Sequence, residues 1–100
     1  MTAHVAIDRE RIAEFCRRWG VQELALFGSV LREDFGPESD VDVLISFRPE
    51  ARKGAFDLVD MADELTAMFE REVEVVDRAG LRNPFRRHAI LTTCEVIHAA

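Results

Sequence analysis

Apolar side chains recur every three or four residues in two segments of the chain, which is the spacing of one face of an α-helix. The first segment is Asp8 to Trp19, where Asp8 is a favourable N-cap and Gly20 can end the helix in a left-handed conformation. The second is Ala55 to Glu70. The apolar residues of the two segments are Ile12, Phe15, Cys16 and Trp19, and Leu58, Met61, Ala62, Leu65, Met68 and Phe69. We therefore predict two amphipathic helices whose apolar faces belong to the core.

Shorter apolar stretches between and after these helices predict β-strands. We expect strands at Val21 to Phe27, Val41 to Phe47 and Val73 to Val76. A short helix should begin at Pro84, with Asn83 as its cap. Residues Glu95 to His98 could form a fourth strand or the end of that helix, and we predict a strand.

The order of these elements favours an α/β (α+β) fold in which a small mixed β-sheet of three to four strands has helices packed on one side. One hundred residues are enough for one compact core, so we expect residues 1–100 to form a single domain. The connector from Val30 to Ser39 contains the turn signal Gly36-Pro37 and could begin with one helical turn.

The net charge of −6 repels polyanions, so general nucleic-acid binding is disfavoured. A small anionic substrate remains compatible with this charge if a metal ion neutralises it. The local basic run of Arg78, Arg82, Arg86 and Arg87 is interpreted as a solvated face. The chain shows no apolar segment long enough to cross a bilayer, no apolar signal core and no cysteine framework, which predicts a cytoplasmic protein with no membrane partner.

Two carboxylates, Asp40 and Asp42, stand two residues apart at the start of the second predicted strand. Side chains at this spacing project to the same face, with Cα atoms about 6–7 Å apart. They repel each other unless a cation lies between them. Magnesium in proteins is commonly bound by one or two carboxylates together with substrate phosphates. The pair is thus a candidate half of a metal site for a nucleotide.

Gly28-Ser29 follows the first predicted strand and can supply the other half of this site. Glycine lets the backbone approach a phosphate, and serine adds a hydroxyl and a backbone N–H. Arg32, one turn further on, could reach a phosphate oxygen. Each signal is weak alone, because Gly-Ser is a common turn and Asp-x-Asp is usually a solvated strand end. Their placement at adjacent strand ends favours function.

A third carboxylate would complete a two-metal site, in which ions about 3.5–4 Å apart clamp the attacking and leaving oxygens. The third strand region offers Glu72, Glu74 and Asp77. Glu74 is the best candidate because a carboxylate among valines is costly unless it is paired or ligated. The competing interpretation places Glu74 in solvent on an edge strand.

Gly28-Ser29, ten residues and then Asp40-x-Asp42 resembles the signature of the nucleotidyltransferase superfamily that includes DNA polymerase beta, and most closely its minimal members, the MNT domains. The resemblance covers nearly the whole chain. It implies the nucleotidyltransferase fold, phosphate binding by Gly28 and Ser29, and magnesium binding by Asp40 and Asp42. It also implies that Glu74 takes the place of a third acidic ligand or base, where the family usually has aspartate. Arg32 stands where many minimal members have arginine.

Many stand-alone MNT proteins resemble this chain in size and are paired with a HEPN-domain RNase toxin. The resemblance thus implies an antitoxin that transfers AMP from ATP to a tyrosine of the toxin, with two Mg²⁺ ions and a hetero-oligomer with that toxin. The chain itself contains no tyrosine, so a tyrosine acceptor would belong to another protein.

Two other functions are weighed against this one. The chain could be a binding module that inhibits a HEPN partner sterically, and glutamate instead of aspartate at position 74 favours this alternative. Nucleic-acid tailing is disfavoured by the acidic charge. Transfer to a small molecule such as an antibiotic is a minor alternative, because transferases of that kind are normally longer.

Overall fold

The computed structural model describes residues 5–32, 36, 39–51 and 55–99. Among these residues, no helix has the length and apolar character needed to cross a membrane. The helices, short 3₁₀ helices (η) and strands are, in chain order, α1 (Arg9–Trp19), β1 (Val21–Phe27), η1 (Gly28–Leu31), β2 (Val41–Phe47), α2 (Ala55–Phe69), β3 (Val73–Asp77), η2 (Arg78–Gly80), α3 (Pro84–Thr93) and β4 (Glu95–Ala99).

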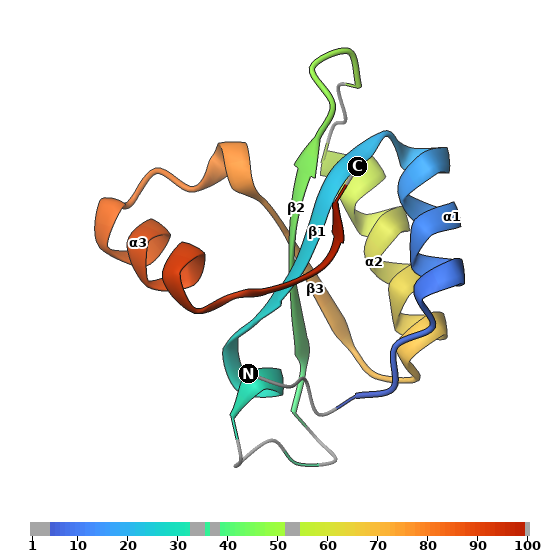
Figure 1. The fold of residues 1–100 in the computed structure, drawn as a ribbon, viewed down its shortest axis with the longest axis horizontal. Helices are drawn as coiled ribbons and strands as arrows, with labels where there is room; N and C mark the ends of the chain where they lie inside the picture. The colour runs from blue at the N-terminus through green and yellow to red at the C-terminus, as the bar shows by residue number, and fades with distance from the viewer. Residues whose placement is uncertain (1–4, 33–35, 37–38, 52–54, 100) are drawn as a thin grey trace.

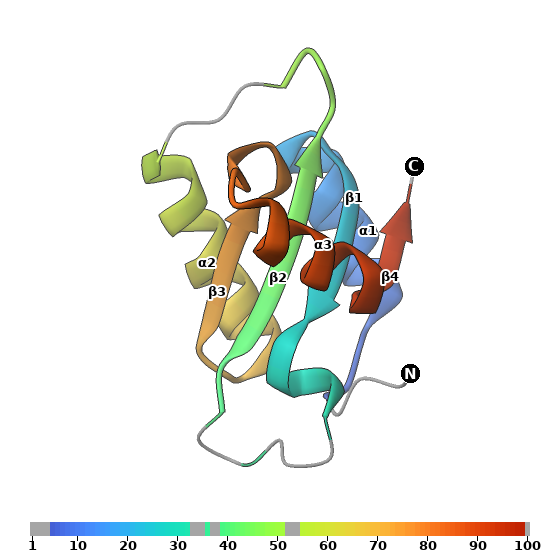
Figure 2. The same cartoon turned by 90° about the vertical axis from the view of Figure 1, so that its left-hand side faces the viewer.

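The strands form a mixed sheet in the order β3-β2-β1-β4 (Figure 2). Strand β1 is antiparallel to both β2 and β4, whereas β2 and β3 are parallel. A parallel pair needs a crossover connection, which α2 provides. The segment from Glu95 to His98 is a strand, as predicted, because it pairs with β1 and leaves β3 and β4 at the two edges.

Helices α1 and α2 cover one face of the sheet and form the larger core with it (Figure 1). Alternation along β2 turns Val41, Val43 and Ile45 toward these helices, and all three are fully buried. The helices contribute the stripes that their spacing predicts, and their fully buried members are Ile12, Phe15, Cys16, Met61 and Leu65.

Helix α3 lies against the opposite face of the sheet (Figures 1 and 2), so the prediction that helices pack on one side is correct for α1 and α2 and wrong for α3. The reason is that part of the other set of alternate strand positions is also apolar. Phe27 and Leu44 are buried there under Leu81 and Ile90, together with Ala25. This second, smaller apolar cluster holds α3 in place.

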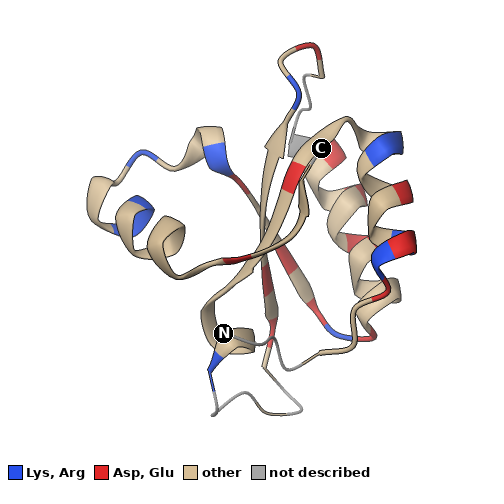
Figure 3. Cartoon of the chain, viewed as in Figure 1, with Lys and Arg blue, Asp and Glu red and all other residues tan. Residues whose placement is uncertain are grey.

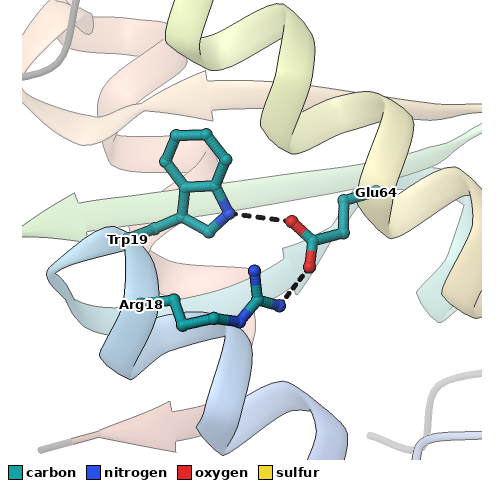
Figure 4. A network of polar contacts seen from close by, with 3 residues as sticks. All are labelled: Arg18, Trp19 and Glu64. Carbon is teal, nitrogen blue, oxygen red and sulfur yellow. Dashed lines mark hydrogen bonds and ion pairs between the residues drawn. The ribbon is translucent and has the colours of Figure 1, made fainter.

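The ends of α1 are fixed as the sequence predicts, and a polar network joins α1 to α2. The Asp8 side chain accepts hydrogen bonds from two backbone N–H groups of the first turn, and Gly20 adopts a left-handed conformation with φ of 71°. Glu64 of α2 accepts a hydrogen bond from the Trp19 indole at 2.9 Å and pairs with Arg18 (Figure 4). These contacts orient the two helices on the sheet.

Candidate active site

The end of β1 and the start of β2 meet at one place, where Phe27 pairs with Asp42 across the antiparallel ladder. Asp42 is two residues before Leu44 on β2, so its side chain lies on the same sheet face, the one that α3 covers. The Gly28-Ser29 turn follows Phe27 directly. The structure therefore brings the glycine-serine turn and the aspartate together, as the spacing of the motif predicts.

The backbone of Gly28 passes close to the Asp42 carboxylate. Its φ of 76° lies in the left-handed region, which favours glycine. A Cβ atom at this position would overlap the carboxylate of Asp42. Ser29 is the second residue of η1, and its hydroxyl donates a hydrogen bond to the backbone carbonyl of Asp40 at 3.3 Å. The turn and the Asp40-Val41-Asp42 segment are thus in direct contact.

Glu74 is the acidic residue of β3 that faces Asp42. The parallel register of β2 and β3 pairs the two residues, and alternation gives them the same sheet face. Each of the two interpretations of Glu74 is correct in part. Its side chain is exposed on an edge strand, and it also lies beside Asp42. Asp77 alternates to the other sheet face, the face of Val73. It caps η2 by accepting a hydrogen bond from the Ala79 N–H.

Asp42 is the electrostatically perturbed group of the site. Its pKa is raised from 3.8 to about 6, chiefly by burial and then by the charge of Glu74, a side-chain hydrogen bond with Glu74 and the charge of Asp40. Arg86 of α3 acts against this rise and lowers the pKa. Carboxylates held together at such a cost are typical of sites that bind a cation or move a proton.

Asp40 is exposed just before β2, and its side chain does not join the other two in a compact group. Among the described residues, no three His, Cys, Asp or Glu side chains form a ready-made metal-binding group. Asp42 and Glu74 are therefore the paired carboxylates, and the charge of Asp40 contributes to the raised pKa of Asp42. The all-oxygen character of this set fits the ligand preference of Mg²⁺.

Two hollows flank the site. One of about 220 Å³ is lined by Gly28, Leu31, Arg32 and Thr93, so Arg32 lies beside the glycine turn as the sequence suggests. The other, of about 380 Å³, lies along the outer edge of β3 and α2 and includes Asp40 and Glu74 in its lining. The glycine turn and the exposed carboxylates thus each border a hollow.

Sequence reasoning missed Arg86. The basic run to which it belongs was interpreted as a solvated face, and the side chains of Arg82, Arg86 and Arg87 are indeed exposed. However, Arg86 also acts on Asp42. The available signal was the absence of any acidic residue between positions 78 and 94 in an otherwise acidic chain.

Comparisons with known proteins agree with this geometry. Residues 9–97 match the model of the family described as nucleotidyltransferase domain. The protein adenylyltransferase MntA of Thermococcus cleftensis is 30% identical over 83 residues, which are 83% of this chain and 75% of that protein.

Solved structures share the fold. A toxin-antitoxin structure with AMP-PNP has a TM-score of 0.76 at 17% identity, covering 94% of this chain and 75% of that one. A complex of tri-AMPylated Shewanella oneidensis HEPN toxin with an MNT antitoxin has a TM-score of 0.67 at 16% identity, covering 92% and 70%. Because the family match spans most of the chain and agrees with the fold, this protein belongs to the nucleotidyltransferase domain family and is a nucleotidyltransferase related to MntA.

Proposed function

We propose that residues 1–100 act as one minimal nucleotidyltransferase domain, an antitoxin that transfers AMP from ATP to a tyrosine of a HEPN-domain RNase toxin in a Mg²⁺-dependent reaction. The observation that carries this proposal is the contact of Gly28 with Asp42, paired in turn with Glu74. The MntA relative is named a protein adenylyltransferase, and a complex of the same fold contains an AMPylated HEPN toxin. Both support AMP as the transferred group and a toxin as the acceptor.

The residues of this chain have separate roles in the proposal. Gly28 and Ser29 donate hydrogen bonds to the nucleotide phosphates from their backbone N–H groups and the serine hydroxyl, and Arg32 adds positive charge from the adjacent hollow. Asp40, Asp42 and Glu74 would hold two Mg²⁺ ions, which neutralise charge on the triphosphate. Because Glu74 is exposed beside Asp42 on the edge strand, a protein acceptor can reach the carboxylate pair from that edge of the sheet.

In the proposed reaction, the tyrosine oxygen attacks the α-phosphorus of ATP. A new O–P bond forms and the bond to the β-phosphate oxygen breaks, so that pyrophosphate leaves. Glu74, or a water beside it, accepts the tyrosine proton, since it is the exposed carboxylate of the pair. The protein contributes mainly by positioning the reactants and stabilising charge.

The mass of the toxin tests this proposal. Each HEPN-domain protein of the same genome is incubated with the chain, Mg²⁺ and ATP, and its intact mass and RNase activity are measured. We expect added AMP units and a loss of RNase activity that requires ATP. A toxin that stays unmodified by the chain would contradict transfer.

A non-catalytic antitoxin is the second candidate. It is favoured by the longer glutamate at position 74 and by the lack of a ready-made group of three ligands among the described residues. Its signature in the same experiment is full inhibition of the RNase without ATP and without any change in the mass of the toxin.

A further inference from the structure

Helix α3 places a basic side chain over the carboxylate site. Ile90 is buried against the sheet face that carries Asp42, and Arg86 precedes it by four residues. Residues four apart lie on the same side of a helix, so Arg86 projects from the side of α3 that faces the sheet. Figure 3 shows basic positions along this segment and acidic ones on the strands beside it.

The positive charge of Arg86 interacts with the carboxylate site. Arg86 lies close enough to Asp42 for the two charges to interact. The side chain is exposed, and within the described residues it makes no hydrogen bond and no salt bridge. Its guanidinium donors are therefore available to a ligand bound beside Asp42.

We propose that Arg86 binds the triphosphate of the nucleotide substrate. This inference rests on the proposed function. A triphosphate is a strong anion that must approach three carboxylates, so it needs cationic partners besides any metal ion. Arginine suits this task because its planar donors can bind two phosphate oxygens at once. Arg32, on the η1 side, and Arg86, on the α3 side, then flank the anion from two directions.

Titration calorimetry with Mg²⁺ and the non-hydrolysable analogue AMP-PNP tests the proposal. Loss of a charge-assisted hydrogen bond should weaken binding by roughly 10- to 100-fold in Arg86→Ala and in Arg86→Gln. Arg87→Ala is the matched control, because it removes the same charge from the next position of α3. Inorganic tripolyphosphate is the second probe and should lose affinity in the Arg86 variants to a similar degree.

The outcomes separate this inference from the proposed function. If the Arg86 variants bind AMP-PNP as well as Arg87→Ala does, the role of Arg86 is refuted while nucleotide binding stands. An affinity loss for AMP-PNP without one for tripolyphosphate would refute the assignment to the triphosphate. If the wild-type chain binds no AMP-PNP in the presence of Mg²⁺, the proposed function itself fails.

Discussion

The backbone of Gly28 passes directly beside the carboxylate of Asp42. A side chain at position 28 would overlap this carboxylate, so the position of Asp42 depends on glycine at position 28. The positive φ at Gly28 brings the chain out of β1 and into η1 within one residue. Asp42 in turn is half-buried between this turn and Glu74. At the residue scale, the site depends on one glycine conformation and one strand register.

We expect Gly28→Ala to destabilise the fold by about 1–2 kcal/mol, because alanine is strained in the left-handed region. Its Cβ would also displace the Asp42 carboxyl, so AMP transfer should fall by about 100-fold or more. Urea unfolding and AMP incorporation measure the two effects. Gly80→Ala is the control, since no atom lies within 4 Å of its new Cβ. Equal behaviour of the two variants would contradict the close fit.

A second prediction concerns pH without divalent cations. Since the pKa of Asp42 is raised from 3.8 to about 6, the folded protein holds this proton more tightly than the unfolded chain does. The free energy of unfolding should therefore decrease as pH rises from 3.8 through about 6. Asp42→Asn should lack this decrease and be more stable than the wild type at pH 7. Asp60→Asn, on the exposed side of α2, should keep it. Parallel pH profiles for all three proteins in urea would argue against the raised pKa.

Among the elements, α2 ends in an unusual way. The helix stops at Phe69, and Glu70 then adopts a φ of 55°, where glycine is the favoured residue. This bend sends the chain into β3, whose register with β2 places Glu74 beside Asp42. The end of α2 therefore contributes to the geometry of the site.

We predict that Glu70→Gly stabilises the protein by about 0.5–1 kcal/mol, because glycine relieves the left-handed strain. Glu70→Ala removes the same carboxylate but keeps a Cβ, so it should bring no such gain. The midpoint of urea unfolding distinguishes the two. A glycine variant no more stable than the alanine variant would contradict the strain.

The sequence was sufficient to predict the helices, the strands and their approximate ends, because apolar spacing and caps are local signals. It did not reveal the side of the sheet on which α3 lies. That choice depends on Leu81 and Ile90 meeting Phe27 and Leu44, which are distant in the chain. The one hint was that Ala25, Phe27 and Leu44, on the strand positions that alternate with the larger core, are also apolar.

For the site, the local motif predicted that Gly28, Ser29, Asp40 and Asp42 come together, and the position of Glu74 among valines made it the best of three acidic candidates. The pairing of Asp42 with Glu74 needed the parallel register, which sequence spacing does not contain. The role of Arg86 was not predicted for a similar reason, because its proximity to Asp42 arises from the packing of α3 on the sheet.

Over the whole molecule, the two faces of the sheet are used differently. The face under α1 and α2 carries the larger core, and the face under α3 carries a small apolar cluster and the carboxylate site. Charge follows the same division, since residues 78–94 contain four arginines and no acidic residue, although the chain as a whole has a net charge of −6. An anionic substrate is therefore expected to approach on the α3 side.

The most direct test of the account is AMP incorporation into the toxin by wild-type chain, Asp42→Asn and Asp60→Asn, with Mg²⁺ and labelled ATP. Asp42→Asn changes little volume, but it removes the charge that would hold the metal ion, so transfer should fall by at least about 100-fold. Asp60→Asn should transfer AMP at the wild-type rate. Transfer by folded Asp42→Asn at that same rate would show that the carboxylate pair is not the catalytic centre.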